Sequence, residues 1–101
     1  MDKKNKPAPG QLTFEIKSET EGGVYSNVAS VVHNPNEFIF DFAVILPGKN
    51  AAQVRSRIIT NPAHAKQFLA ALEENVARYE ANFGEIKPPN MIKDPGNSTV
   101  H

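Results

Sequence analysis

Two arginines and one aspartate have the types and spacing that could form a charged site. Arg55 and Arg57 are two positions apart in a segment rich in β-branched residues, so a regular strand puts both side chains on one face of a sheet. Asp41 lies in the preceding apolar segment, where an adjacent strand would bring it to one of them. Two interpretations follow: a cross-strand ion-pair cluster beside a dimer interface, or a phosphate-binding pair with Tyr25 available for stacking.

The histidines and acidic residues do not form a catalytic or metal-binding pattern. His33, His64 and His101 are the histidines of the chain, and no pair of them has the spacing that brings two ligands to one metal ion. Glu73 and Glu74 are neighbours on an expected helix, so their side chains point about 100° apart. Cysteine is absent, which excludes disulfides and thiol chemistry. We therefore expect neither enzymatic activity nor a cofactor.

Residues 62–83 predict one long amphipathic helix, around which the rest of the chain is organised. Asn61 can cap its first turn, Pro62 suits the first helical position, and Gly84 can end it in a left-handed conformation. Its length is roughly 33 Å, and a single-faced helix of that length needs a surface to lie on. Spacings of three and four define an apolar stripe that consists of Ala65, Phe68, Leu69, Leu72, Val76, Tyr79 and Phe83.

The residues before this helix predict the sheet on which it packs. Alternating or β-branched segments at about 12–17, 24–33, 37–46 and 53–60 are each bounded by turn residues, and we interpret them as strands. The expected fold class is α+β: a four-stranded antiparallel β-meander followed by one long C-terminal helix packed on one sheet face, in the order ββββα.

Side-chain alternation divides the predicted sheet into two faces. A hairpin at residues 34–36 would place Val31 near Ile39 and Ala29 near Asp41. One strongly apolar face would receive the helix and collects Leu12, Phe14, Ile16, Val28, Val32, Phe38, Phe40, Phe42, Val44, Val54 and Ile58. The other face keeps large apolar residues although no second helix covers it, which usually marks an interface. The residues predicted to form this interface or ligand platform are Tyr25, Asn27, Val31, His33, Ile39, Asp41, Ile45, Arg55, Arg57 and Ile59.

Composition sets the expected domain organisation and location. Residues 1–10 are basic and contain prolines, which predicts a disordered arm. Residues 11–86 are expected to form one domain, and residues 87–101 a mostly disordered tail. No apolar run is long enough to span a membrane, and the N-terminus lacks the apolar stretch of a secretory signal. We therefore expect a cytoplasmic protein.

Several fragments of the chain, considered together, resemble an uncharacterised bacterial family of short soluble proteins, a domain of unknown function. They are Gly23 to Asn27, His33, Glu37-Phe38 with Asp41-Phe42, Leu46 to Gly48, Ser56 to Ile58, Pro62 with His64 and Lys66, Leu72 with Asn75, Tyr79-Glu80, and Phe83 to Ile86. The resemblance covers roughly residues 11–86 and implies no activity. It suggests that one recurring pattern contains Tyr25, Asn27, His33, Asp41, Arg57 and His64.

The expected function is that of a small non-enzymatic interaction or oligomerisation module, a homodimer that uses its open sheet face and could also bind a protein partner. The alternative is a single-stranded nucleic-acid-binding protein that uses the sheet as a platform. The order ββββα is similar to the repeat of the purine-rich-element-binding and Whirly proteins, which dimerise and bind single-stranded nucleic acid on their β-sheets. The formal net charge of zero counts against this alternative, because it gives little long-range attraction for phosphate.

Overall fold

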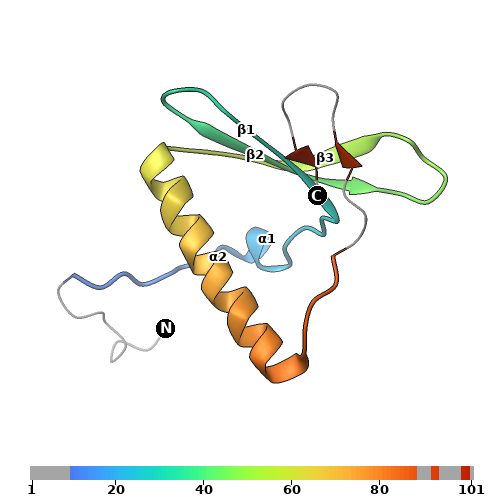
Figure 1. Cartoon of the computed structure of the whole chain (residues 1–101). Helices are drawn as coiled ribbons and strands as arrows, with labels where there is room; N and C mark the ends of the chain where they lie inside the picture. Colours follow the sequence, from blue (N-terminus) through green and yellow to red (C-terminus); the bar gives the residue numbers. More distant parts are fainter. Residues whose placement is uncertain (1–9, 89–91, 94–98, 101) are drawn as a thin grey trace.

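A computed structural model describes residues 10–88, 92–93 and 99–100 (Figure 1). The expectations of disorder at residues 1–9, 89–91, 94–98 and 101 lie outside the described residues, whereas residues 92–93 and 99–100 of the expected tail form strands. The elements in chain order are α1 (Ser18–Glu21), β1 (Val28–His33), β2 (Phe38–Ile45), β3 (Ala52–Thr60), α2 (Pro62–Phe83), β4 (Ile92–Lys93) and β5 (Thr99–Val100). The α+β class is confirmed.

The sheet is antiparallel, with the strand order β3-β2-β1-β5-β4. Strands β1, β2 and β3 form the expected meander, and α2 follows it (Figure 1). The prediction of four strands before the helix is wrong, because three strands precede α2. Residues 12–17 are not in the sheet, and α1 occupies the segment that was expected to be a turn. The edge of β1 that this segment would have joined is paired with β5 instead.

The second strand is also shorter than predicted, since it begins at Val28 rather than at residue 24. Asn27 explains this boundary. Its side-chain Oδ1 accepts a hydrogen bond from the backbone N–H of Ile45 at 2.9 Å, and its Nδ2 donates to the carbonyl of Ile45 at 3.2 Å. The side chain thus satisfies the backbone groups that a longer strand would have paired, and Asn27 ends the ladder.

The register of the first hairpin differs by one residue from the prediction. Val31 lies opposite Phe40 and Val32 lies opposite Ile39. Because directly opposed residues share a face and a shift of one position exchanges the faces, the face assignments along β1 are reversed. The helix-side face, defined by Phe38, Phe40 and Phe42, receives Ala29, Val31 and His33. The outer face, defined by Ile39, Asp41 and Ala43, receives Val28, Ser30 and Val32.

Strand β3 contains an irregularity that displaces two further assignments. Phe42 lies opposite Ser56, whereas the next residue, Ala43, lies opposite Val54. Arg55 is therefore the extra residue of a bulge, which locally interrupts the alternation of side chains. Val54 joins the outer face instead of the helix-side face.

Helix α2 has the bounds that its sequence predicts. The Asn61 side chain accepts a hydrogen bond from the His64 backbone N–H at 2.7 Å, as expected of a cap. Gly84 follows the last turn with φ 98° and ψ 169°, a conformation that favours glycine but is not the expected left-handed helical one. The helix meets the sheet near its N-terminus and then runs obliquely away from it (Figure 1).

The core of the described chain is small. Its buried apolar residues are Val28, Ala43, Val44 and Ala65, and Ala65 is the only buried residue of α2. The helix does contact the phenylalanine-rich face, because the ring of Phe68 meets that of Phe40 edge-on with centroids 5.6 Å apart. Toward its C-terminal end the helix diverges from the sheet (Figure 1), and the last residues of the apolar stripe, Tyr79 and Phe83, are exposed.

Candidate interaction surface

An ion pair joins β2 and β3 on the outer face. The guanidinium of Arg57 donates to both carboxylate oxygens of Asp41, at 2.7 Å and 2.8 Å, and the two residues are directly opposed. The hydrogen bond and charge of Arg57 lower the pKa of Asp41 below its ordinary value, and the same bond raises the pKa of Arg57. The side chain of Asp41 is 16% exposed and that of Arg57 is 61% exposed. The predicted contact between Asp41 and one arginine is confirmed.

The second arginine does not share this arrangement. Arg55 occupies the bulge and has no ion pair among the described residues. Tyr25 is exposed and lies in the connection before β1 rather than on a strand. The expected platform of two arginines and a stacking tyrosine on one regular sheet face is therefore not formed, because one arginine is neutralised and the other lies at an irregular position.

The two described histidines, His33 and His64, contact neighbouring residues. The ring of His33 stacks on that of Phe38, with centroids 5.3 Å apart, on the helix-side face. Nδ1 of His64 lies 2.8 Å from the hydroxyl oxygen of Thr60, beside the helix cap. Within the described part of the chain, no group of three or more histidine or acidic side chains could hold a metal ion.

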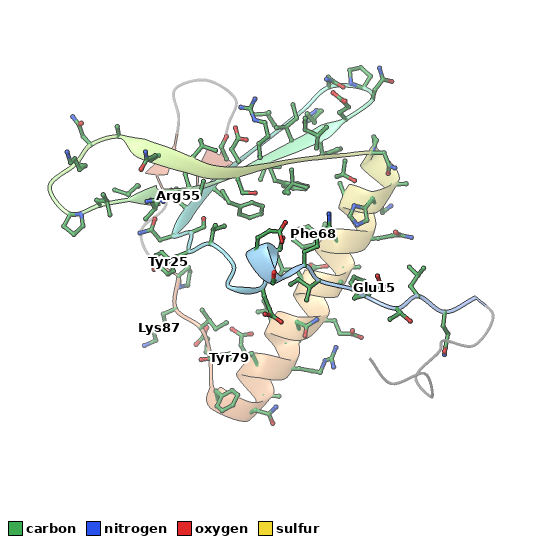
Figure 2. The ribbon with its side chains drawn as sticks, turned by 180° about the vertical axis from the view of Figure 1, so that it is seen from behind. Glu15, Tyr25, Arg55, Phe68, Tyr79 and Lys87 are labelled. Atoms are coloured by element: carbon green, nitrogen blue, oxygen red, sulfur yellow. The ribbon has the colours of Figure 1, made fainter. Side chains whose placement is uncertain are left out.

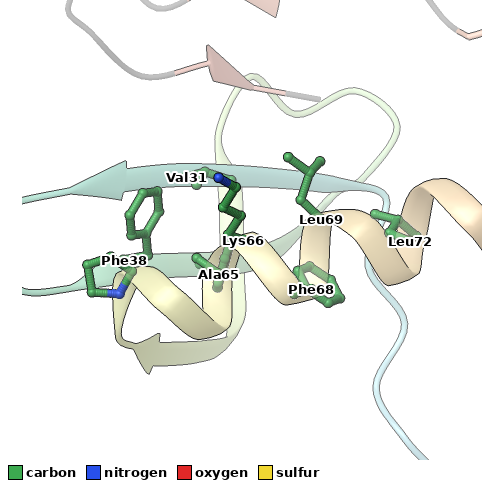
Figure 3. Close-up of a pocket in the computed structure, with 9 residues that line it drawn as sticks. Val31, Phe38, Ala65, Lys66, Phe68, Leu69 and Leu72 are labelled. Carbon is green, nitrogen blue, oxygen red and sulfur yellow. The ribbon is translucent and has the colours of Figure 1, made fainter.

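An open apolar groove lies between α2 and the helix-side face (Figure 3). Its volume is about 560 Å³, and Lys66 is the single charged side chain among the described residues that line it. The remaining lining residues are Val31, Phe38, Phe40, Pro62, Ala65, Phe68, Leu69 and Leu72. The first half of the helix stripe thus forms one wall, and the sheet forms the other.

The stripe continues along α2 beyond the end of this groove. Figure 2 shows Phe68 near the sheet and Tyr79 toward the far end of the helix. Leu72 is 49% exposed and Phe83 is 74% exposed, and the ring of Phe83 contacts only that of Tyr79 among the described aromatic pairs. Large apolar side chains therefore face solvent over most of the length of α2.

A second apolar surface lies in the segment before α1. Leu12, Phe14 and Ile16 were expected in the core, but all three are exposed, and Phe14 is 93% exposed. Because the segment lies outside the sheet, it has no strand beside it to cover these side chains. Its alternating pattern is typical of a strand that packs on an apolar surface.

The chain matches the model of one protein family over residues 1–88, described as a protein of unknown function, DUF3467. The chain belongs to this family. This confirms the resemblance to an uncharacterised domain that the sequence fragments indicated. No curated protein and no solved structure matches it.

The outer face of this DUF3467 protein carries only part of the predicted interface. The predicted residues that do lie on this face are Ile39, Asp41, Ile45, Arg57 and Ile59. The shifted register places Val31 and His33 on the helix-side face instead. Tyr25 and Asn27 precede β1, and Arg55 lies in the bulge.

The sequence analysis missed the groove and the exposed stripe of this DUF3467 protein. The predicted strands at 24–33 and 37–46 would span about 33 Å, which equals the length of about 33 Å expected for the helix, so a comparison of lengths gave no sign of them. The stripe is exposed because α2 runs obliquely away from the sheet (Figure 1). No helix in the described residues combines the length and the apolar character needed to cross a membrane.

Proposed function

We propose that this protein is a non-enzymatic interaction module that works as a homodimer. The observation that supports the proposal is the large apolar surface on the helix side, made of the open groove and the exposed stripe of α2. Monomeric soluble proteins rarely leave contiguous apolar surfaces of this kind in water. In this proposal the helix side is the dimer interface, and the outer face remains open to a protein partner.

The proposed dimer moves the interface from the face where the sequence placed it. The outer face retains Ile39, Ile45 and Ile59 around the Asp41–Arg57 ion pair, but Ile39 and Ile45 are already half-buried. The helix side exposes more large side chains, including Phe68, Leu69, Leu72 and Tyr79. Burial of apolar area is the main favourable term in association, so the helix side offers the larger gain.

Binding of single-stranded nucleic acid has less support. A phosphate-binding surface needs cations that are free to meet phosphates, and the Arg57 guanidinium is bonded to Asp41. The chain also has a formal net charge of zero, which gives no long-range attraction for a polyanion.

The experiment is sedimentation equilibrium of the full chain at 1–100 μM, as an order of magnitude set by dimers of modest affinity. We expect a mass of twice the 11.1 kDa of one chain. Val76→Asp places a charge on the stripe and should shift the equilibrium to monomer. Ala70→Asp is the matched control, because position 70 lies on the opposite side of the same helix and is exposed. A monomeric wild type throughout this range contradicts the proposal.

Titration with a labelled single-stranded oligonucleotide tests the alternative in the same samples. Salt-sensitive binding that is lost in Arg55→Ala/Arg57→Ala would favour nucleic-acid binding over the interaction module, because phosphate contacts weaken as salt rises. We expect no such binding.

A further inference from the structure

The segment before α1 has the sequence pattern of a β-strand but lies outside the sheet. Its apolar side chains Leu12, Phe14 and Ile16 alternate with Thr13, Glu15 and Lys17. We call residues 12–17 the leading segment. It runs from α1 across α2 and then outward from the molecule (Figure 1), and all three apolar side chains are exposed. One side of this extended segment is therefore apolar, and its own chain does not bury it.

The groove between α2 and the helix-side face has the complementary property. It is open, and its walls are apolar except for Lys66 (Figure 3). Residues 65–72 of α2 form one wall, which is about 10 Å long at the rise of an α-helix. An extended segment places residues 12 and 16 about 13 Å apart with their side chains on the same side. The apolar side of the leading segment therefore matches the groove in both length and chemistry.

We propose that the leading segment of one copy occupies the groove of a second copy. This inference rests on the proposed homodimer and names the part of the chain that forms its interface. Two-fold symmetry makes the exchange reciprocal, so each copy gives one segment and receives one. The apolar side of the leading segment and the groove are then covered by one arrangement.

The path of the chain favours a second copy over the segment's own groove. Asn27 is fixed to Ile45 by two hydrogen bonds, and the hydroxyl of Ser26 donates to the carbonyl of Ala43 at 2.9 Å. Residues 18–21 form α1, whose first turn begins on the carbonyl of Lys17. From the anchored residues 26 and 27, the described path of the chain carries the leading segment past α2 and away from the groove of its own chain (Figure 1).

Engineered disulfides distinguish exchange from self-occupancy, because the natural chain has no cysteine. The full chain is prepared as two double variants, Phe14→Cys/Leu69→Cys and Phe14→Cys/Leu72→Cys. Each variant, at a low micromolar protein concentration, is treated with oxidised glutathione. We expect a covalent dimer on a non-reducing gel from at least one pair. The matched control carries Thr13→Cys in place of Phe14→Cys. Residue 13 faces away from the groove, so the yield of covalent dimer should be at least tenfold lower. A covalent monomer, or no bond from either pair, overturns the inference.

A second pair of variants tests the same contact without a cross-link. Phe14→Asp should weaken dimerisation at least tenfold in sedimentation equilibrium, because it places a charge among apolar groups. Thr13→Asp adds the same charge to the other side of the segment and should change dimerisation by less than about threefold, as expected of an exposed position. Equal effects of the two changes overturn the inference. If the wild type dimerises but Phe14→Asp does not weaken the dimer, the proposed homodimer is retained and the proposed segment exchange is wrong. If the wild type is monomeric, both proposals are wrong.

Discussion

Replacement of Leu72 by alanine separates the part of the helix stripe that stabilises one chain from the part that stabilises the proposed dimer. Full burial of a leucine side chain contributes about 1.5–3 kcal/mol, and Leu72 is 49% exposed in the single chain. About half of this free energy is therefore gained when one chain folds, and the other half is available on association. In a symmetric dimer the residue counts twice, so Leu72→Ala should cost the dimer about 1.5–3 kcal/mol of association free energy.

This loss corresponds to a rise of roughly 10- to 150-fold in the dimer Kd. The loss of unfolding free energy caused by Leu72→Ala should be smaller than for a buried leucine, in proportion to the exposed fraction of Leu72. A leucine in a full core costs about 2–5 kcal/mol when it is changed to alanine, so a half-exposed one should cost about 1–2.5 kcal/mol of unfolding free energy. The assay is sedimentation equilibrium for association, combined with urea unfolding of the same variant at a concentration where the wild type is monomeric.

Gln67→Ala is the matched control, because residue 67 is exposed on the opposite side of the same helix and should change neither quantity by more than about 0.5 kcal/mol. The reasoning is refuted if Leu72→Ala leaves the dimer Kd unchanged while the unfolding free energy falls by the full amount. That result would mean that Leu72 lies in the core of a single chain and that the stripe is not an interface.

Three further changes test individual contacts. Asn61→Ala should lower the unfolding free energy by about 0.5–2 kcal/mol in urea, because it removes the helix cap; no change would show that the cap is redundant. Asn27→Ala should lower it by about 1–2 kcal/mol through loss of two hydrogen bonds, with Asn27→Asp recovering part of this as an acceptor. Because Arg57 lowers the pKa of Asp41, the carboxylate stabilises the folded chain above pH about 3.9 and loses this effect as pH falls through the lower folded value. The urea midpoints of the wild type and Asp41→Asn should therefore begin to approach each other as pH falls below about 4 and converge below the lowered pKa of Asp41, and a constant difference across that range would contradict the ion pair's role.

The helix, the last two strands of the meander and the Asp41–Arg57 contact could be predicted because local signals determine them. Asn61 and Pro62 fix the start of α2, and the alternation along β2 and β3 fixes most of their faces. The register of the first hairpin could not be predicted in this way. The four-residue connection from Asn34 to Glu37 closes on a backbone hydrogen bond between these two residues, and a turn only one residue different would have reversed every face of β1.

The failure at residues 12–17 has a different cause. Their alternation predicts a strand as strongly as that of β3 does, but a strand forms only where another strand supplies hydrogen bonds. The edge of β1 that residues 12–17 would have joined is paired with β5. These residues therefore do not pair with β1. The prediction of a strand of the sheet at residues 12–17 was therefore wrong, because alternation shows that one side of a segment is apolar but does not show what it packs against.

The distribution of apolar residues supports the proposed dimer. Apolar residues make up 40% of the sequence, an amount that ordinarily supports a packed core, yet the buried apolar residues of the described chain are four. Many of the exposed large apolar residues lie on the leading segment and on the helix side, and the leading segment matches the groove in length and chemistry. The path of one chain keeps its leading segment apart from its groove. A second copy could bring these two apolar surfaces together and so complete the core that the composition supports.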